Sequence, residues 1–139
     1  MSELQIGQVL SLTLPLDNNG KLRGNHPYII FEIDSDMNTI EIVQLSSLDG
    51  KEYEAIFPHN KVVYKERPLE TVIDKDSFVR LNYKITLDLF EDLVKYRRQT
   101  DKLKKFDIVS KAYKEYHNEN AVEDSHIIYV SEERLKELN

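Results

Sequence analysis

Side chains that could bind a phosphate group or transfer a proton occur at several places along the chain. Cationic side chains can hold a phosphate, hydroxyl groups can hydrogen-bond to it, and a histidine can act as base or acid near neutral pH. Two cationic residues lie in a polar loop, and one histidine directly precedes a proline. Two serines end a run of alternating polar and apolar residues, and an arginine follows later in the chain. These residues are Lys21 and Arg23, His26, Ser46 and Ser47, and Arg80.

The common catalytic signatures that depend on a metal or a cofactor are absent from the sequence. There is no cysteine, so neither a disulfide nor a thiolate metal site can form. The four histidines show no spacing typical of a zinc site. The four glycines are scattered, so no phosphate-binding glycine loop is present. We therefore expect neither a metal nor a cofactor.

Short apolar or alternating runs, separated by turn residues, predict a β-rich first part of the chain. Asn19-Gly20, Gly24-Asn25 and Asp49-Gly50 are typical turn dipeptides. The runs at 28–33 and 39–45 are close enough to form a hairpin. The expected strands cover residues 7–16, 28–33, 39–45, 54–57, 61–64 and 76–81.

The hydrophobic period changes after Tyr83 and predicts one or two helices. Thr86 can cap a first helix, and Thr100 or Asp101 can cap a second. A single long helix with a polar middle is the competing interpretation. A β-like run follows at 126–130, and Ser131 can begin a terminal helix. The stripe expected on the second helix consists of Leu103, Phe106, Val109, Ala112, Tyr113 and Tyr116.

This order of elements predicts an α+β, β-rich fold. We expect residues 1–85 to form a small, bent antiparallel barrel. Residues 86–139 should form a helical extension packed on the barrel, with a short strand near 126–130. No apolar run is long enough to span a bilayer, and residues 1–10 lack the features of a signal peptide. A cytoplasmic protein without a membrane partner is therefore expected.

Charge is distributed unevenly along this acidic chain. The formal net charge is −6 and the sequence pI is about 5.2. Residues 95–114, however, hold eight Lys or Arg against two Asp. A solvated helix face is the simplest interpretation of this basic block, and a phosphate-attracting surface is the functional one. In the second case Lys102, Lys104 and Lys105 are candidates for binding nucleic acid.

The order of motifs in residues 6–95 resembles the MazF/PemK family of toxins, which have a CcdB-like, SH3-like barrel. Members open with a glycine at the first strand, as at Gly7, and have a cationic loop that ends before a proline. A later strand ends in a short Thr/Ser motif, and a further strand carries a basic residue. This chain differs from the family at two motif positions: His26-Pro27 replaces the family's Arg-Pro, and Gln8 replaces the acidic residue that opens the first strand. Residues beyond 95 have no counterpart in the family pattern.

The resemblance implies a metal-independent endoribonuclease that cleaves single-stranded RNA, as the toxin of a toxin–antitoxin pair. It also implies a homodimer and a cognate antitoxin as partners. Arg23, His26, Ser46 and Ser47 would then be catalytic, and Lys21, Arg80 and the three lysines of the basic block would bind RNA. A non-catalytic barrel that binds protein or nucleic acid remains the alternative, in which His26 marks lost activity.

Overall fold

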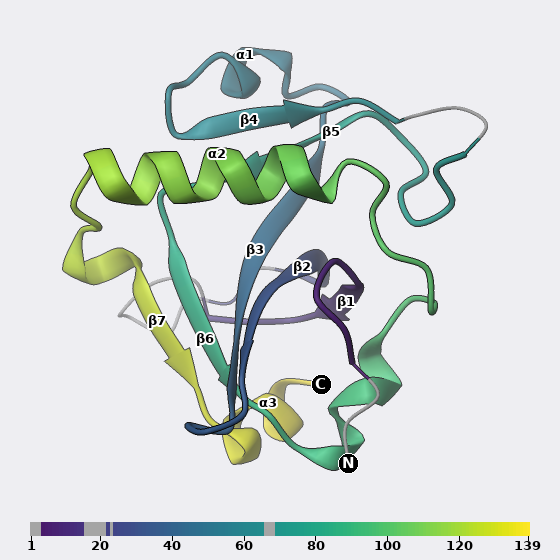
Figure 1. Ribbon diagram of the computed structural model, residues 1–139, viewed down its shortest axis with the longest axis vertical. Coiled ribbons are helices and arrows are strands. Elements are labelled where there is room, and N and C mark those ends of the chain that lie inside the picture. The colour runs from purple at the N-terminus through teal and green to yellow at the C-terminus, as the bar shows by residue number, and fades with distance from the viewer. Residues whose placement is uncertain (1–3, 16–21, 23, 66–68) are drawn as a thin grey trace.

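The computed structural model describes residues 4–15, 22, 24–65 and 69–139, and it has an α+β, β-rich fold (Figure 1). The strands are β1 (Val9–Leu12), β2 (His26–Asp34), β3 (Thr39–Ser47), β4 (Asn60–Val63), β5 (Ser77–Arg80), β6 (Lys84–Asp88) and β7 (Ile127–Val130). The helices are α1 (Glu52–Ala55), η1 (Glu91–Tyr96), α2 (Phe106–Glu119), η2 (Asp124–His126) and α3 (Glu132–Leu138). The predicted fold class is therefore confirmed at this coarse level.

Strand β3 is the centre of a seven-stranded sheet among the described residues. One edge pairs with β2 in an antiparallel register that includes Tyr28 opposite Gln44. The other edge pairs first with β6 over Thr39–Ile42 and then with β5 over Leu45–Ser47. The sheet order β1-β2-β3-β5-β4 is open, with β6 and β7 on a branch, so these strands do not close into a barrel.

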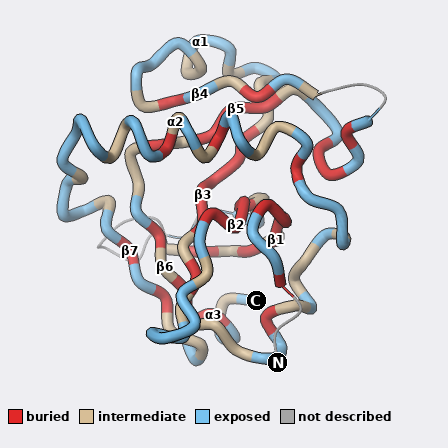
Figure 2. Tube along the Cα trace, in the orientation of Figure 1, coloured by how far each residue is buried: buried red, intermediate tan, exposed pale blue. Residues whose placement is uncertain are grey.

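Both faces of this sheet are buried, so β2 and β3 carry apolar side chains in both directions (Figure 2). One core contains Tyr28 and Ile42 and is closed by Leu93 of η1 and Leu135 of α3. The other contains Ile29 and is covered by α2. The unbroken apolar run at 28–33 is thus the signature of a strand between two layers.

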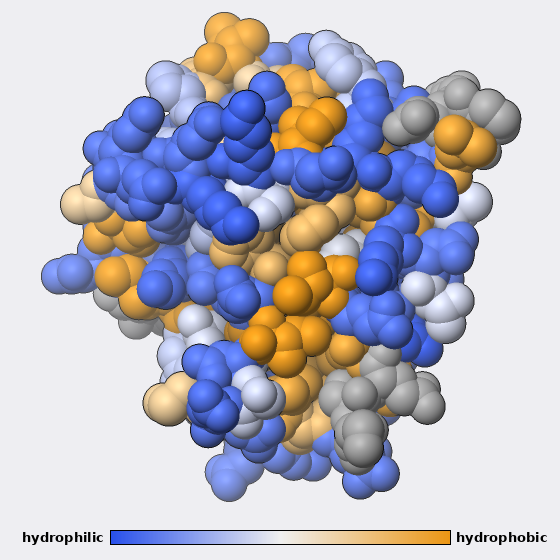
Figure 3. All heavy atoms as spheres, viewed as in Figure 1, coloured by the Kyte–Doolittle hydropathy of each residue, from blue (hydrophilic) through white to orange (hydrophobic). Residues whose placement is uncertain are grey.

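The apolar stripe predicted for the second helix is confirmed in α2 and the segment that precedes it. All six stripe residues lie in or against the second core, and the outward face of α2 is mostly hydrophilic (Figure 3). The helix begins at Phe106, and residues 97–105 are not helical, so the single long helix is excluded. The late strand is β7, which pairs in parallel with β6, and Ser131 caps α3 by accepting a hydrogen bond from the Arg134 N–H.

The predicted helix starting at Thr86 is wrong, because Lys84–Asp88 forms strand β6. Ile85 and Leu87 alternate with polar residues, and both side chains are fully buried in the first core. Residues 85–88 pair with residues 39–42 at the edge of β3. This long-range pairing cannot be predicted from local propensity. Only a short 3-10 helix, η1, remains of the predicted first helix. Within the described ranges, no helix combines the length and apolar character needed to cross a bilayer.

A buried hydrogen bond joins α2 to the sheet and makes a testable prediction. The Tyr113 hydroxyl donates to the Glu41 carboxylate, and burial followed by this contact raises the pKa of Tyr113, so the hydroxyl keeps its proton. Tyr113→Phe leaves the half-buried carboxylate without its donor and should lower the free energy of unfolding by about 1–3 kcal/mol. Urea unfolding followed by circular dichroism measures this loss.

Tyr129→Phe is the matched control for this prediction. The Tyr129 hydroxyl also donates to a carboxylate, that of Asp88, but Tyr129 is 61% exposed. Water can replace an exposed partner, so this variant should change stability by no more than about 0.5 kcal/mol. Equal losses in the two variants would contradict the role given to the buried contact.

Candidate functional site

A pocket of about 300 Å³ lies where the start of β2 and the end of β3 meet the start of β5. It brings together three of the residues singled out from the sequence, His26, Ser46 and Ser47, with residues from three other segments. The pocket is lined by His26, Pro27, Leu45, Ser46, Ser47, Lys51, Ile73, Asp74, Lys75, Ser77 and Arg98.

The strand register relates His26 to Ser46. Tyr28 lies opposite Gln44 as the last pair of the β2–β3 ladder. Alternation places His26 and Ser46, two residues beyond this pair on each strand, on the face that carries Tyr28 and Gln44. Ser46 is 3% exposed, and its Oγ has no hydrogen-bond partner among the described residues. A half-buried imidazole and an uncommitted hydroxyl therefore share one end of the sheet.

Ser47 faces the opposite side of β3 and has a structural partner. Its Oγ accepts a hydrogen bond from the Asp49 N–H at 3.2 Å, which supports the turn after β3. It pairs across the sheet with Ser77, whose own hydroxyl donates to the Lys75 carbonyl at 2.9 Å. Alternation along the strand thus separates the two serines, and Ser46 is the one on the same face as His26.

Arg98 enters the pocket from a segment far away in the sequence. Its backbone N–H donates to the Val9 carbonyl, and its Nε donates to Ser11 Oγ at 2.9 Å. A longer contact of 3.5 Å joins Nη1 to the Val72 carbonyl. These contacts hold the guanidinium at the edge of β1. Its other N–H groups make no hydrogen bond within the described structure.

The charge around the pocket favours an anion. Lys51, Lys75 and Arg98 line it against a single carboxylate, that of Asp74. Lys75 pairs with Asp49 at 2.6 Å, and this hydrogen bond and charge raise the pKa of the exposed lysine. The arrangement can bind a phosphate group between a guanidinium, a lysine and a serine hydroxyl, with an imidazole beside it. No group of three potential metal ligands exists in the part of the chain that the structure describes.

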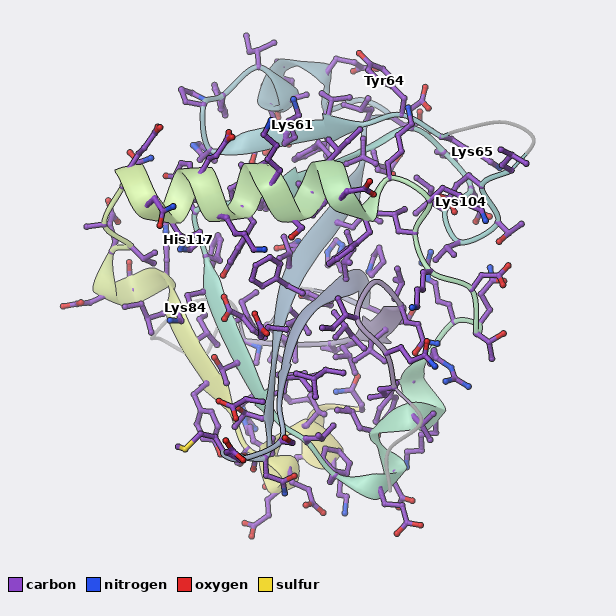
Figure 4. The ribbon with its side chains drawn as sticks, in the orientation of Figure 1. Lys61, Tyr64, Lys65, Lys84, Lys104 and His117 are labelled. Carbon is purple, nitrogen blue, oxygen red and sulfur yellow. The ribbon has the colours of Figure 1, made fainter. Side chains whose placement is uncertain are left out.

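No other predicted site residue that the structure describes lines this pocket. Lys21 and Arg23 fall outside the described residues. Arg80 ends β5 at the opposite end from Ser77 and pairs with Glu54 at 3.3 Å, with a largely buried side chain. Lys102, Lys104 and Lys105 precede α2, and Figure 4 shows Lys104 in the segment that leads into this helix.

Sequence reasoning missed several residues of the site. Arg98 belongs to the basic block, but only the pairing of residues 97–98 with β1 brings it to the pocket. Lys51, Asp74, Lys75 and Ser77 also line the pocket and were not singled out. Gln44, two residues before Ser46 in β3, does not line it, but it is 1% exposed and neither its Nε2 nor its Oε1 has a partner among the described residues.

No protein-family model matches the chain, and no curated protein matches it.

The pocket geometry predicts that Arg98 contributes to anion binding. Arg98→Gln removes the charge while keeping a side chain that can reach Ser11, so affinity for inorganic phosphate should fall about tenfold, as for loss of a charged hydrogen bond. Amide chemical shifts of residues 46–51 and 74–77 report the binding. Arg134→Gln, at an exposed arginine paired with Glu137 on α3, is the control and should bind like the parent chain. Equal affinity in all three proteins would remove Arg98 from the site.

Proposed function

We propose that the chain is a metal-independent endoribonuclease of the MazF/PemK type, acting on single-stranded RNA at the pocket between β2, β3 and β5. The observation that carries the proposal is that His26 and the buried Ser46, whose hydroxyl has no partner among the described residues, line one pocket with three cationic residues. An imidazole can act as base or acid, and a hydroxyl and a guanidinium can stabilise the phosphate, in cleavage by the RNA's own 2′-hydroxyl.

The proposed reaction needs no external nucleophile. The 2′-oxygen attacks the adjacent phosphorus and its proton passes to the His26 imidazole. The bond from phosphorus to the 5′-oxygen breaks, and that oxygen takes a proton from His26 in a coupled step or from water. Arg98 and the Ser46 hydroxyl hydrogen-bond to the phosphate oxygens, where negative charge grows in the transition state. The products are a 2′,3′-cyclic phosphate and a free 5′-hydroxyl.

The finer fold assignment, a relation to the SH3-like or CcdB-like bent antiparallel barrels, is part of this proposal, in an open form because the described strands do not close into a barrel. It is supported by the antiparallel order β1-β2-β3-β5-β4 and by β3, which pairs along two edges with three strands. The proposal also includes a homodimer, a cognate antitoxin that competes with RNA, and cytoplasmic action. Expression of the chain alone should then arrest growth, whereas the His26→Ala variant should not.

The two serines give the sharpest test of the catalytic site. Ser46→Ala removes a pocket-lining hydroxyl that has no partner among the described residues, and cleavage of a mixed-sequence single-stranded RNA should slow by about 10–100-fold. The Ser47 hydroxyl already accepts from the Asp49 N–H, so Ser47→Ala should slow cleavage less. Rates are measured under single-turnover conditions in EDTA. Slower cleavage by Ser47→Ala with normal cleavage by Ser46→Ala would contradict the assignment.

The three lysines before α2 should act through charge alone. Replacing Lys102, Lys104 and Lys105 with Gln should weaken RNA binding and reduce its dependence on salt, because fewer counterions are released. The rate of the chemical step at saturating protein should stay the same. Fluorescence anisotropy at two salt concentrations and single-turnover cleavage separate these effects. An unchanged salt dependence would exclude the lysines from the RNA-binding surface.

A further inference from the structure

A second cavity lies at the far end of β5, opposite the pocket. It has two adjoining hollows of about 500 and 290 Å³, which share His59 and Tyr116. The C-terminal half of α2, the start of β4, the link between β5 and β6, and residues 121–126 surround it. Figure 4 shows Lys61 on β4 and His117 on α2, the two elements that face each other across this region.

Two residues that line the cavity have a buried hydrogen-bond acceptor with no donor among the described residues. Asn60 Nδ2 donates to the Glu54 carbonyl at 2.7 Å, and because a carbonyl only accepts, this contact fixes the orientation of the amide. Asn60 is 8% exposed, and its Oδ1 has no partner among the described residues. The same is true of the buried Oδ1 of Asn82, which lines the smaller hollow.

His126 adds a further acceptor. Its Nδ1 lies 3.2 Å from the Asn82 carbonyl oxygen, so Nδ1 carries the hydrogen in this contact. In the neutral ring Nε2 is then the acceptor. The ring stacks on Tyr83, with centroids 4.3 Å apart and planes inclined by 22°, which holds its orientation. Asn60 lines the larger hollow, and Asn82 and His126 line the smaller one, so both parts of the cavity have hydrogen-bond acceptors beside them.

The charges around the cavity disfavour a phosphate. Glu115, Glu119 and Glu123 line it against Lys61 alone, so an anion would be repelled. Burial, followed by the charge of Arg80, lowers the pKa of His59, so this ring favours its neutral form. A neutral ligand that donates hydrogen bonds fits the acidic lining and the acceptors without a donor.

The aromatic groups favour a flat ligand. The His59 ring lies 5.5 Å from the Phe57 ring, and Tyr116 lines both hollows. Base stacking on aromatic side chains is a common source of affinity for single strands. Ser77, at the start of β5, lines the pocket, and Leu81, directly after β5, lines the cavity. At the rise of a strand these two residues are about 13 Å apart, which gives the distance between the two sites.

We infer that this cavity binds one unpaired nucleobase by its donor-bearing edge, with guanine preferred, and so selects the RNA sequence that is cut. The choice of a nucleobase rests on the proposed function, because RNA supplies the base. Guanine presents a ring N–H and an amino group on one edge, whereas uracil presents only one N–H. Asn60, Asn82 and His126 would accept from these donors.

The test uses nucleosides, which carry no phosphate and therefore cannot report on the cleavage site. Guanosine, adenosine, cytidine and uridine are titrated into the full chain, and amide chemical shifts are followed. Guanosine should bind most tightly and uridine most weakly, with shifts concentrated at residues 59–61, 82, 116 and 126. No shift with any nucleoside at millimolar concentration, or equal binding of guanosine and uridine, would overturn the inference.

A pair of variants separates base recognition from folding and from cleavage. Asn82→Leu removes an unpartnered acceptor and should weaken guanosine binding about tenfold without lowering the urea midpoint. Asn118→Leu, on the exposed side of α2, should bind guanosine like the parent chain. With RNA, Asn82→Leu should still cleave but with reduced sequence preference. Guanosine binding by a chain that never cleaves RNA would reject the proposed function and retain the base site.

Discussion

The structure depends on the pairing of β3 with three strands. Its first edge holds β2, and its second edge is shared between β6 and β5, which are joined by the short segment Leu81–Tyr83. Because side chains alternate along a strand, this one strand contributes to the cores on both faces of the sheet. The same alternation sends Ser46 and Ser47 to opposite faces at the end of the strand. The pocket is thus a consequence of where β3 ends.

The second half of the chain completes the pocket and supports the sheet. Residues 97–103 run along β1: the Leu103 N–H donates to the Gly7 carbonyl, and Gln8 Nε2 donates to the Thr100 carbonyl. Gly7 has a φ of +94°, a backbone conformation that other residues rarely adopt, and a Cβ there would lie 3.3 Å from Lys102 Cβ. Glycine at this position lets the returning segment approach closely, and that segment brings Arg98 to the pocket.

Hydrophobic periodicity and helix-capping residues correctly predicted several elements of the fold. The α2 stripe, the Ser131 cap and the buried run of β2 follow from periodicity and capping chemistry. The prediction of the first helix was wrong because Lys84–Asp88 pairs with the free edge of β3 and forms a strand. His26, Ser46 and Ser47 do line one pocket, but Arg98 could not be predicted. Its position depends on long-range pairing with β1, which a single sequence does not reveal.

The central claim is that this pocket cleaves RNA through the substrate's own 2′-hydroxyl. The most direct measurement compares a single-stranded RNA with the same strand carrying a 2′-deoxy nucleotide at the cleaved position, in EDTA, with products resolved by mass spectrometry. The account predicts that the RNA gives a 2′,3′-cyclic phosphate and that the substituted strand stays intact at that position. Cleavage of both strands, or of neither by the chain freed of any partner, would contradict it.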